Sequence, residues 1–136
     1  MSLSERLVEL QIVLPKIATP VANYIPANRT GNLIFSSGQV PFKDGKLAYA
    51  GKVPSNVTLE QAADAARISM LNALSACANL VGGIDAIARV VRVTVFVNSD
   101  PTFTDHPKVA TGASDLLVQI FGDAGRHARS ALGASA

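Results

Sequence analysis

The sequence is poor in the residues on which many catalytic and structural sites depend. Its 136 residues include one cysteine, two histidines and no tryptophan. A single cysteine, Cys77, excludes an internal disulfide, so a reducing and therefore cytoplasmic setting is expected. No apolar run approaches the roughly 18 residues of a membrane span, and Met1–Arg6 lacks the charged and apolar sections of a signal peptide. We therefore expect no membrane partner.

Recognisable catalytic motifs are also missing. The glycines form neither a phosphate-binding loop nor a dinucleotide fingerprint, and Ser36-Ser37-Gly38 lacks the glycine spacing of a hydrolase nucleophile elbow. No group of Cys, His, Asp and Glu has metal-ligand spacing, so no metal is expected. His106 and His127 are far apart and each falls in a predicted loop, which favours structural roles as surface or turn residues.

Charge and composition indicate a folded domain rather than a nucleic-acid-binding chain. The net charge of +2 is small and the basic residues are scattered, so no nucleic-acid partner is expected. Nearly half of the residues, 49%, are hydrophobic and they occur throughout the chain, which is typical of a globular protein. The length suits one domain with its own core but not two.

The most strongly patterned stretch predicts a long helix followed by a strand. Thr58 and Gln61 have the spacing of a capping box, and Gly82-Gly83 marks the helix end. Steps of three and four place one apolar set on a single face: Ala63, Ala66, Met70, Leu74, Cys77 and Val81. The opposite side carries the polar set Asp64, Arg67, Asn72, Ser75 and Asn79. Cys77 is therefore expected to be a buried, inert thiol.

The strand predicted over residues 87–98 has two different faces. One face carries Val91, Val93, Val95 and Val97 and should meet the helix. The other face carries Val90, Arg92, Thr94 and Phe96. Because this second face is too apolar for open water, we expect a second subunit to cover it.

The remaining elements follow from turn and cap residues. We predict a first helix over residues 4–12 with Ser4 as N-cap, strands over residues 20–25, 32–40 and 46–50, a second long helix from Asp105 to Gly122, and an extended segment over residues 126–136. Gly31 and Asp44-Gly45 mark turns, and Gly38 suggests a bulge or a close backbone approach. The pattern predicts an α+β fold: one sheet with two helices on one face.

Arg129 is the strongest candidate for ligand binding. Its neighbours in the segment HARSALG are small, so a guanidinium there would be accessible and could bind a carboxylate through two parallel hydrogen bonds. From composition alone, however, a solvated arginine on an edge strand is the favoured interpretation.

Several segments resemble the RidA/YjgF family, also known as the endoribonuclease L-PSP family. The segment NLIFSSGQVP, residues 32–41, resembles the family's GN-hydrophobic-SGQ-P signature, and residues 90–97 resemble its central strand. Ile120-Phe121-Gly122 followed by Ala128-Arg129-Ser130 resembles the family's FFG…ARS ending. Tyr24 lies seven residues before Gly31, at the position of the tyrosine in the family's GPYSQA segment. The segments occur in the family's order over roughly residues 20–134.

The resemblance implies a fold and an assembly. The implied fold is the chorismate-mutase-like α+β fold, with one mixed sheet and two helices packed on one face. The implied assembly is a homotrimer with sites in the clefts between subunits. Residues 1–136 would then form one domain, with residues 1–18 as an N-terminal extension.

It also implies an activity, the hydrolysis of reactive 2-imino or enamine acids to 2-keto acids and ammonia. By this resemblance Arg129 would hold the substrate carboxylate, Tyr24 would line the pocket, and Ser37 with the backbone at Gly38 would position substrate or water. Neither a metal nor an organic cofactor would be needed.

The sequence also departs from the family pattern. The serine and glutamine of the PYSQA segment are absent, and Ala131 stands where the typical branch often has a cysteine. Ser114 stands where that branch has an asparagine, and by the resemblance it is expected to be a fifth substrate-binding residue. The family's last strand, with a glutamate thought to orient the catalytic water, is expected to be absent.

Two hypotheses therefore stay open, a deaminase and a non-catalytic binder of small carboxylates such as 2-keto acids or amino acids. A ribonuclease is disfavoured by the weak charge and the lack of a histidine pair or a basic groove.

Overall fold

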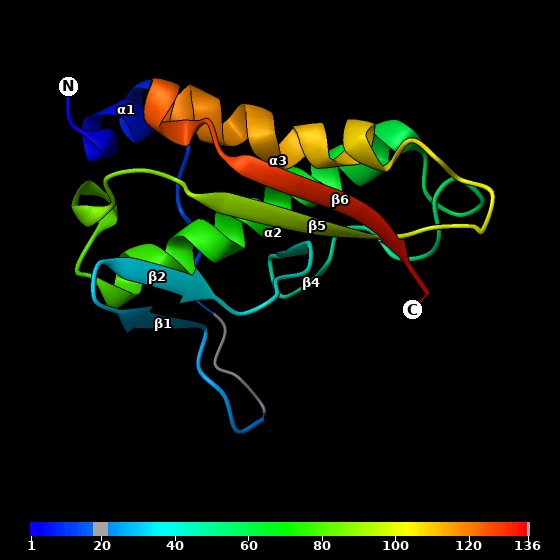
Figure 1. The fold of residues 1–136 in the computed structure, drawn as a ribbon, viewed down its shortest axis with the longest axis horizontal. Coiled ribbons are helices and arrows are strands. Elements are labelled where there is room, and N and C mark those ends of the chain that lie inside the picture. The colour runs from blue at the N-terminus through cyan, green and yellow to red at the C-terminus, as the bar shows by residue number, and fades with distance from the viewer. Residues whose placement is uncertain (18–21, 136) are drawn as a thin grey trace.

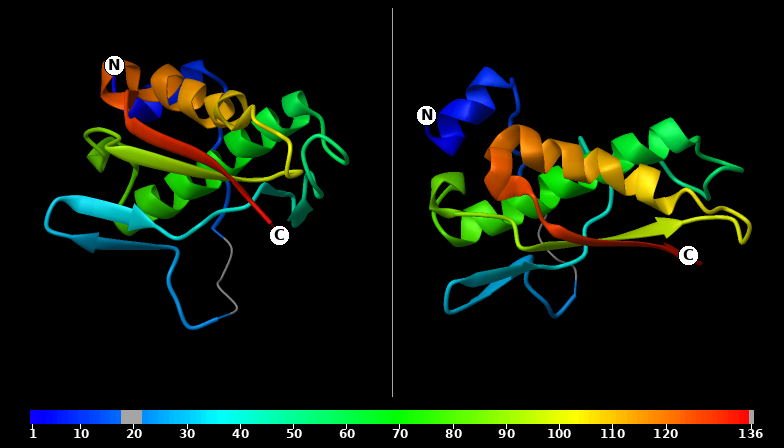
Figure 2. Two further views of the ribbon diagram at one scale, coloured as in Figure 1. Left: turned by 45° about the vertical axis from the view of Figure 1, so that its right-hand side comes forward. Right: turned by 45° about the horizontal axis from the view of Figure 1, so that its top comes forward.

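The computed structural model describes residues 1–17 and 22–135. Two long helices lie in one layer, and the strands lie against one side of it (Figures 1 and 2). The elements in chain order are α1 (Leu3–Glu9), β1 (Ala27–Thr30), β2 (Leu33–Ser36), β3 (Phe42–Lys43), β4 (Lys46–Leu47), α2 (Leu59–Leu80), η1 (Ile84–Ala86), β5 (Arg92–Asn98), α3 (His106–Phe121), η2 (Gly122–Gly125) and β6 (Ala128–Ala134). The α+β class is confirmed.

Helix α2 begins with the expected capping box. The Thr58 side chain accepts from the backbone N–H of Gln61, and the Gln61 side chain accepts from the backbone N–H of Thr58. The helix ends before Gly82 and Gly83, both at positive φ. The predicted faces are only partly right. Of the predicted apolar face only Leu74 is buried, whereas the neighbouring Ala62, Ile68, Ala76 and Ala78 are buried as well. On the predicted polar side Ser75 is buried, because its hydroxyl donates to the carbonyl of Pro15 in the N-terminal segment.

Helix α3 has the predicted ends, with Asp105 as N-cap, Pro107 in the first turn and Gly122 as C-cap. The helix buries one apolar face, namely Val109, Ala113, Leu116, Leu117 and Ile120. Gly112 lets α3 approach α2 closely, since a Cβ there would come within 1.9 Å of the Ala63 carbonyl oxygen. The glycine that weakens the helix by propensity therefore permits its packing.

Strands β5 and β6 run parallel, and α3 connects them. Val93 and Val97 are buried against the helices, while Arg92, Thr94 and Phe96 face outward, as the alternation predicts. The strand begins at Arg92 rather than at residue 87, so Val91 precedes it and is 58% exposed. The extended segment predicted at the C-terminal end forms β6.

The N-terminal strands differ from the prediction. Residues 22–25 form no strand, and residues 20 and 21 lie outside the described part. The turn at Gly31, with φ of +55°, instead pairs β1 directly with β2. Strand β2 ends at Ser36 rather than Val40, and no other described residue of this chain lies within 4 Å of a Cβ built at Gly38.

The second hairpin has the predicted turn but shorter strands. Asp44 and Gly45 both have positive φ, which is typical of a type I′ hairpin turn. They join β3 to β4, which ends at Leu47 rather than at residue 50.

The expected single sheet is also wrong. Among the described residues the strands form three two-stranded sheets, β1–β2, β3–β4 and β5–β6. Strand β2 lies beside β5 in Figures 1 and 2, but no ladder joins them. Alternation in a sequence specifies which side chains share a face, but it does not specify which strand edges pair. Strands of only four residues add little information about this pairing. The two helices still cover one side, as predicted.

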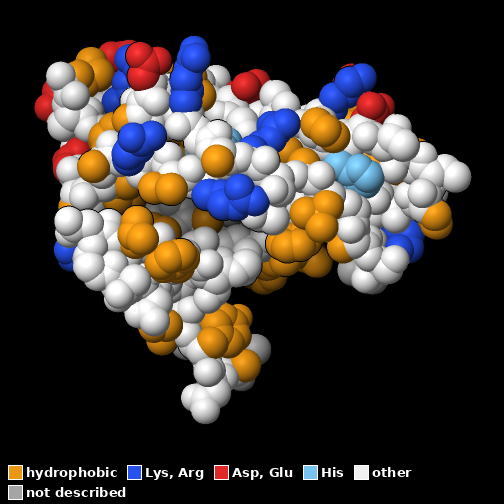
Figure 3. Space-filling model, in the orientation of Figure 1, with side chains coloured by type: hydrophobic (Ala, Val, Ile, Leu, Met, Phe, Trp, Pro, Cys, Tyr) orange, Lys and Arg blue, Asp and Glu red, His pale blue; other side chains and the backbone are white. Residues whose placement is uncertain are grey.

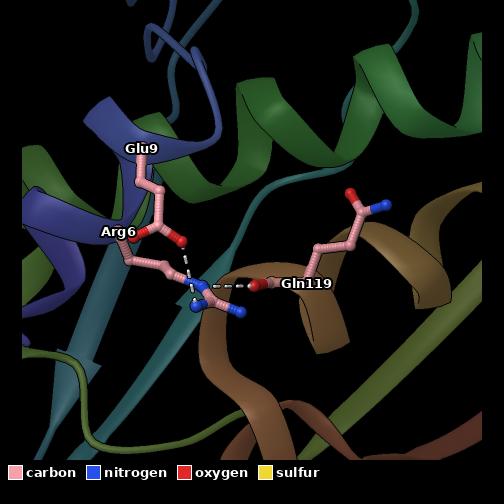
Figure 4. A network of polar contacts seen from close by, with 3 residues as sticks. All are labelled: Arg6, Glu9 and Gln119. Atoms are coloured by element: carbon pink, nitrogen blue, oxygen red, sulfur yellow. Dashed lines mark hydrogen bonds and ion pairs between the residues drawn. The ribbon is translucent and has the colours of Figure 1, made fainter.

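The N-terminal segment packs onto the core. Ser2, rather than Ser4, caps α1 and accepts from the backbone N–H of Glu5, because Ser4 binds Asp85 instead. Helix α1 ends at Glu9, and Leu7 is buried with residues of α2 and α3. Arg6 donates from Nε to the Gln119 carbonyl at 3.1 Å and lies 3.4 Å from the Glu9 carboxylate (Figure 4).

The outward face of the strands is strongly apolar. Phe96 is 68% exposed, Phe35 is 59% exposed and Leu132 is 41% exposed. Figure 3 shows hydrophobic side chains on both sides of a central basic group on this face. A covering subunit remains a prediction. In the part of the chain that the structure describes, no helix is long and apolar enough to cross a membrane.

Candidate functional site

A hollow of about 380 Å³ lies where α3 faces the start of β6. It is lined by Ser114 and Val118 of α3 and by Arg126, His127 and Arg129 of the segment that leads into β6. Figure 1 shows α3 and β6 side by side over this region. A volume at the low end of the usual range for ligand pockets suits a small molecule.

Arg129 reaches the hollow from the edge of the sheet. It pairs with Val93 in the ladder, and its side chain lies on the helix side of β6. Nη1 donates to Ser114 Oγ at 3.1 Å, and the guanidinium makes no other hydrogen bond to a described residue. No carboxylate of residues 1–17 or 22–135 forms an ion pair with it. The rest of this donor fork is therefore free to bind an anion.

A chain of hydrogen bonds fixes the tautomer of the neutral His127 ring. Its Nδ1 lies 2.6 Å from the Gly125 carbonyl oxygen, which can only accept, so Nδ1 carries the proton. In the neutral ring Nε2 then accepts the proton of Ser114 Oγ, which is 2.9 Å away. Consequently Ser114 donates to His127 and accepts from Arg129, and its remaining lone pair is available to a ligand or a water.

Gly125 is essential to this arrangement. A Cβ at Gly125 would come within 2.2 Å of the Leu117 carbonyl oxygen. Only glycine therefore lets the chain pass so close to α3, and this passage brings the Gly125 carbonyl under His127.

Arg126 completes the basic side of the hollow. Its Nε lies 3.6 Å from Asp123, three residues earlier, and both side chains are largely exposed. An exposed ion pair of this kind contributes at most about 1 kcal/mol, so a bound anion can compete for Arg126.

The structure brings together two of the five residues predicted for the site. Ser114 and Arg129 are hydrogen-bonded, whereas Tyr24, Ser37 and Gly38 do not line this hollow. Tyr24 is 56% exposed in the segment before β1, and Ser37 Oγ donates to the Ile25 carbonyl at 2.5 Å. The β1–β2 hairpin lies on the far side of β5 from β6 (Figures 1 and 2).

Sequence reasoning missed His127 and Arg126 as lining residues. His127 precedes Arg129 by two positions, and residues two apart along an extended segment share a face, so this spacing was the available signal. His106 also differs from the prediction, because it is the first residue of α3 rather than a loop residue.

The groups with shifted pKa values lie outside the hollow. Cys77 is half-buried rather than buried as expected, and burial raises the pKa of its thiol, which agrees with an inert cysteine. A hydrogen bond to Asp64 at 2.8 Å raises the pKa of Tyr49. Over the described residues no group of three His, Cys, Asp or Glu side chains could hold a metal ion.

Comparison with known proteins identifies the family. A family model described as "YjgF/chorismate mutase-like, putative endoribonuclease" matches residues 4–134. The chain belongs to this family. Protein TCP17 of Trypanosoma cruzi is 40% identical over 125 residues, which cover 91% of this chain and 78% of that protein.

Solved structures support the same assignment. A putative endoribonuclease from Shewanella oneidensis is similar with a TM-score of 0.93 and 34% identity, over 98% of this chain and 89% of that one. A protein of unknown function from Agrobacterium tumefaciens is similar with a TM-score of 0.87 and 38% identity, over 99% and 82% of the two chains. The fold is therefore that of YjgF-like structures, in agreement with the resemblance found in the sequence.

Proposed function

We propose that this YjgF-family chain hydrolyses reactive 2-imino or enamine acids to 2-keto acids and ammonia. The observation that carries the proposal is Arg129, whose guanidinium is anchored to Ser114 in the hollow and is paired with no described carboxylate. A guanidinium held in this way binds a carboxylate through two parallel hydrogen bonds. The bound carboxylate would place the adjacent imine carbon over Ser114 and His127.

The hydrogen-bond chain supplies a proton acceptor. A water oxygen bonds to the carbon of the protonated imine, and the C=N π electrons move to nitrogen. The water proton passes to Ser114 Oγ as Ser114 passes its own proton to His127 Nε2. His127 then returns that proton to nitrogen, the C–N bond breaks, and ammonia leaves with the hydroxyl proton as ammonium. The 2-keto acid remains, and atoms and charge balance.

The neighbouring subunit would complete the site. In a homotrimer the exposed apolar face of β5 and β6 is covered, and the Tyr24 segment with Ser37 and Gly38 of one subunit would close the Arg129 hollow of the next. The separation of these two groups within one chain is what an inter-subunit site requires. Light scattering tests whether the trimer forms. The activity of Tyr24→Phe tests whether the Tyr24 segment contributes to the site.

The test is hydrolysis of 2-iminopropionate, generated in situ by an amino-acid oxidase. The parent should accelerate it, and Arg129→Ala should lower kcat/KM by roughly 100-fold, since a charge-assisted bidentate pair is lost. Arg129→Lys should recover only part of the loss, because lysine lacks the fork. Full activity in Arg129→Ala would refute the proposed role of this arginine.

A non-catalytic binder of small carboxylates is the second candidate. It is favoured by the absence of any Asp or Glu among the residues that line the hollow, since a carboxylate is a common activator of water. If 2-oxobutyrate binds through Arg129 but 2-iminopropionate is hydrolysed no faster than in buffer, the binder is correct. Cleavage of RNA is disfavoured by the small net charge of +2.

A further inference from the structure

The Arg129 hollow is more basic than a single carboxylate requires. Arg126, His127 and Arg129 all line it, and no acidic residue does. A monocarboxylate on Arg129 would leave Arg126 unused. The only described carboxylate paired with Arg126 is that of Asp123, 3.6 Å away and fully exposed.

The two arginines can serve one small ligand. They are three residues apart, so their Cα atoms are separated by at most about 10 Å, and both side chains face the same hollow of about 380 Å³. Val118 is an exposed apolar residue in the lining of the hollow, against which the methylene groups of a ligand can pack.

We propose that this hollow accepts a small dicarboxylate, with one carboxylate on Arg129 and the second on Arg126. On the proposed function, on which this assignment of substrate rests, the substrate is a 2-imino dicarboxylic acid and the product is a 2-oxo dicarboxylic acid. Asp123 then competes with the second carboxylate for Arg126 and limits its affinity.

Binding tests the ligand class without requiring catalysis. Calorimetry with the full chain should show 2-oxoglutarate binding about ten-fold more tightly than 2-oxobutyrate, because only the former engages Arg126. Arg126→Gln should reduce the 2-oxoglutarate affinity to about that of 2-oxobutyrate and should weaken 2-oxobutyrate binding far less. Asp123→Asn should strengthen 2-oxoglutarate binding by a few-fold.

Lys108→Gln is the matched control. Lys108 and Asp105 form an exposed pair with the same spacing of three residues and a similar separation of 3.7 Å, but neither residue lines the hollow. This variant should leave both affinities unchanged. Equal affinity for the two acids in the parent, or equal weakening of both in Arg126→Gln, would overturn the proposal, as would tight binding of inorganic phosphate without a preference for 2-oxoglutarate.

Turnover separates this inference from the proposed function. A preference for 2-oxoglutarate that depends on Arg126, in a protein that hydrolyses no imine, would support the dicarboxylate hollow and refute the deaminase. The opposite result would be hydrolysis of 2-iminopropionate that depends on Arg129, with no faster hydrolysis of 2-iminoglutarate and no effect of Arg126→Gln. It would support the deaminase and refute the dicarboxylate hollow.

Discussion

A serine–histidine pair lies near each end of strand β6, but the two pairs have different surroundings. Ser114 and His127 are 2.9 Å apart at the start of β6. Ser99 and His106 are 3.1 Å apart near its end. The first pair lines an open hollow beside the exposed Arg129, and the second contains a buried serine that is only 8% exposed.

The backbone at Gly133 packs directly against the Ser99–His106 pair. A Cβ at Gly133 would come within 2.8 Å of His106 Nε2 and 2.9 Å of Ser99 Oγ, so the backbone of β6 covers both groups. The Phe103 ring packs edge-on against His106, with ring centroids 5.1 Å apart. No charged group is part of this contact, and the pair joins the ends of β5, α3 and β6.

The difference teaches that a hydrogen-bonded serine and histidine do not by themselves make a reactive site. The open pair has a fixed tautomer, an arginine that can bind an anion, and space for a ligand. The closed pair has only packed neighbours, so it contributes to stability. The first two predictions below separate these roles.

Removal of His127 should lower activity, whereas removal of His106 should lower stability. The loss of activity is the largest change we expect. His127→Ala should slow 2-iminopropionate hydrolysis roughly 100-fold, the lower end of a general-base contribution, and should leave the free energy of unfolding nearly unchanged. His106→Ala should destabilise the fold and leave kcat of the folded protein unchanged. Steady-state kinetics and urea unfolding of both variants measure this. Comparable loss of activity in both would contradict the assignment.

Gly133→Ala should destabilise the closed end by about 2 kcal/mol, the middle of the range for overpacking. The new methyl group cannot fit between His106 and Ser99 without moving the strand. Gly38→Ala is the control, because nothing lies within 4 Å of its Cβ and its φ is not positive. Urea unfolding should show a lower midpoint for Gly133→Ala alone. An unchanged midpoint would mean that the closed pair relaxes freely.

Much of the framework around both pairs follows from the sequence. The capping box of α2, the ends of α3 and the alternation of β5 depend on residues close together in the chain, and the structure confirms them. The family resemblance also follows from the local segments, and the comparison confirms it.

The remaining features depend on distant contacts. Ser75 is buried because Pro15 lies over it, and Ser114 meets His127 only because Gly125 lets the chain return close to α3. The strand edges that pair are likewise set by packing rather than by alternation. Local patterns therefore predict Arg129 as an accessible cation and can place His127 on the same face, but they do not predict the hydrogen bond between His127 and Ser114.

The two serines should differ by a smaller amount. Ser99→Ala should lower the free energy of unfolding by about 1 kcal/mol, since it leaves His106 Nε2 without its partner in a closed site. Ser114→Ala should cost less than about 0.5 kcal/mol, because water can replace the hydroxyl in an open hollow, but it should weaken 2-oxobutyrate binding. Urea unfolding and calorimetry test the pair. Equal destabilisation by both would show that the hollow is closed to water.

A third serine provides the smallest effect, because its partner is an exposed carboxylate rather than an imidazole. The Ser4 hydroxyl lies 2.6 Å from Asp85 and its backbone N–H lies 2.9 Å away, and together they hold the pKa of Asp85 below its ordinary value of 3.8. A carboxyl group whose pKa is lower in the folded state stabilises the fold at pH values above its unfolded-state pKa, and this contribution is lost as the pH falls through the folded-state pKa.

Ser4→Ala should therefore lower the urea midpoint slightly at pH 7 and not at all at the most acidic pH at which the fold survives. Asp85→Asn should abolish the dependence of this difference on pH, since asparagine does not titrate. A midpoint difference between the parent and Ser4→Ala that persists unchanged from pH 7 into acid would show that Ser4 acts through helix α1 rather than through the Asp85 carboxylate.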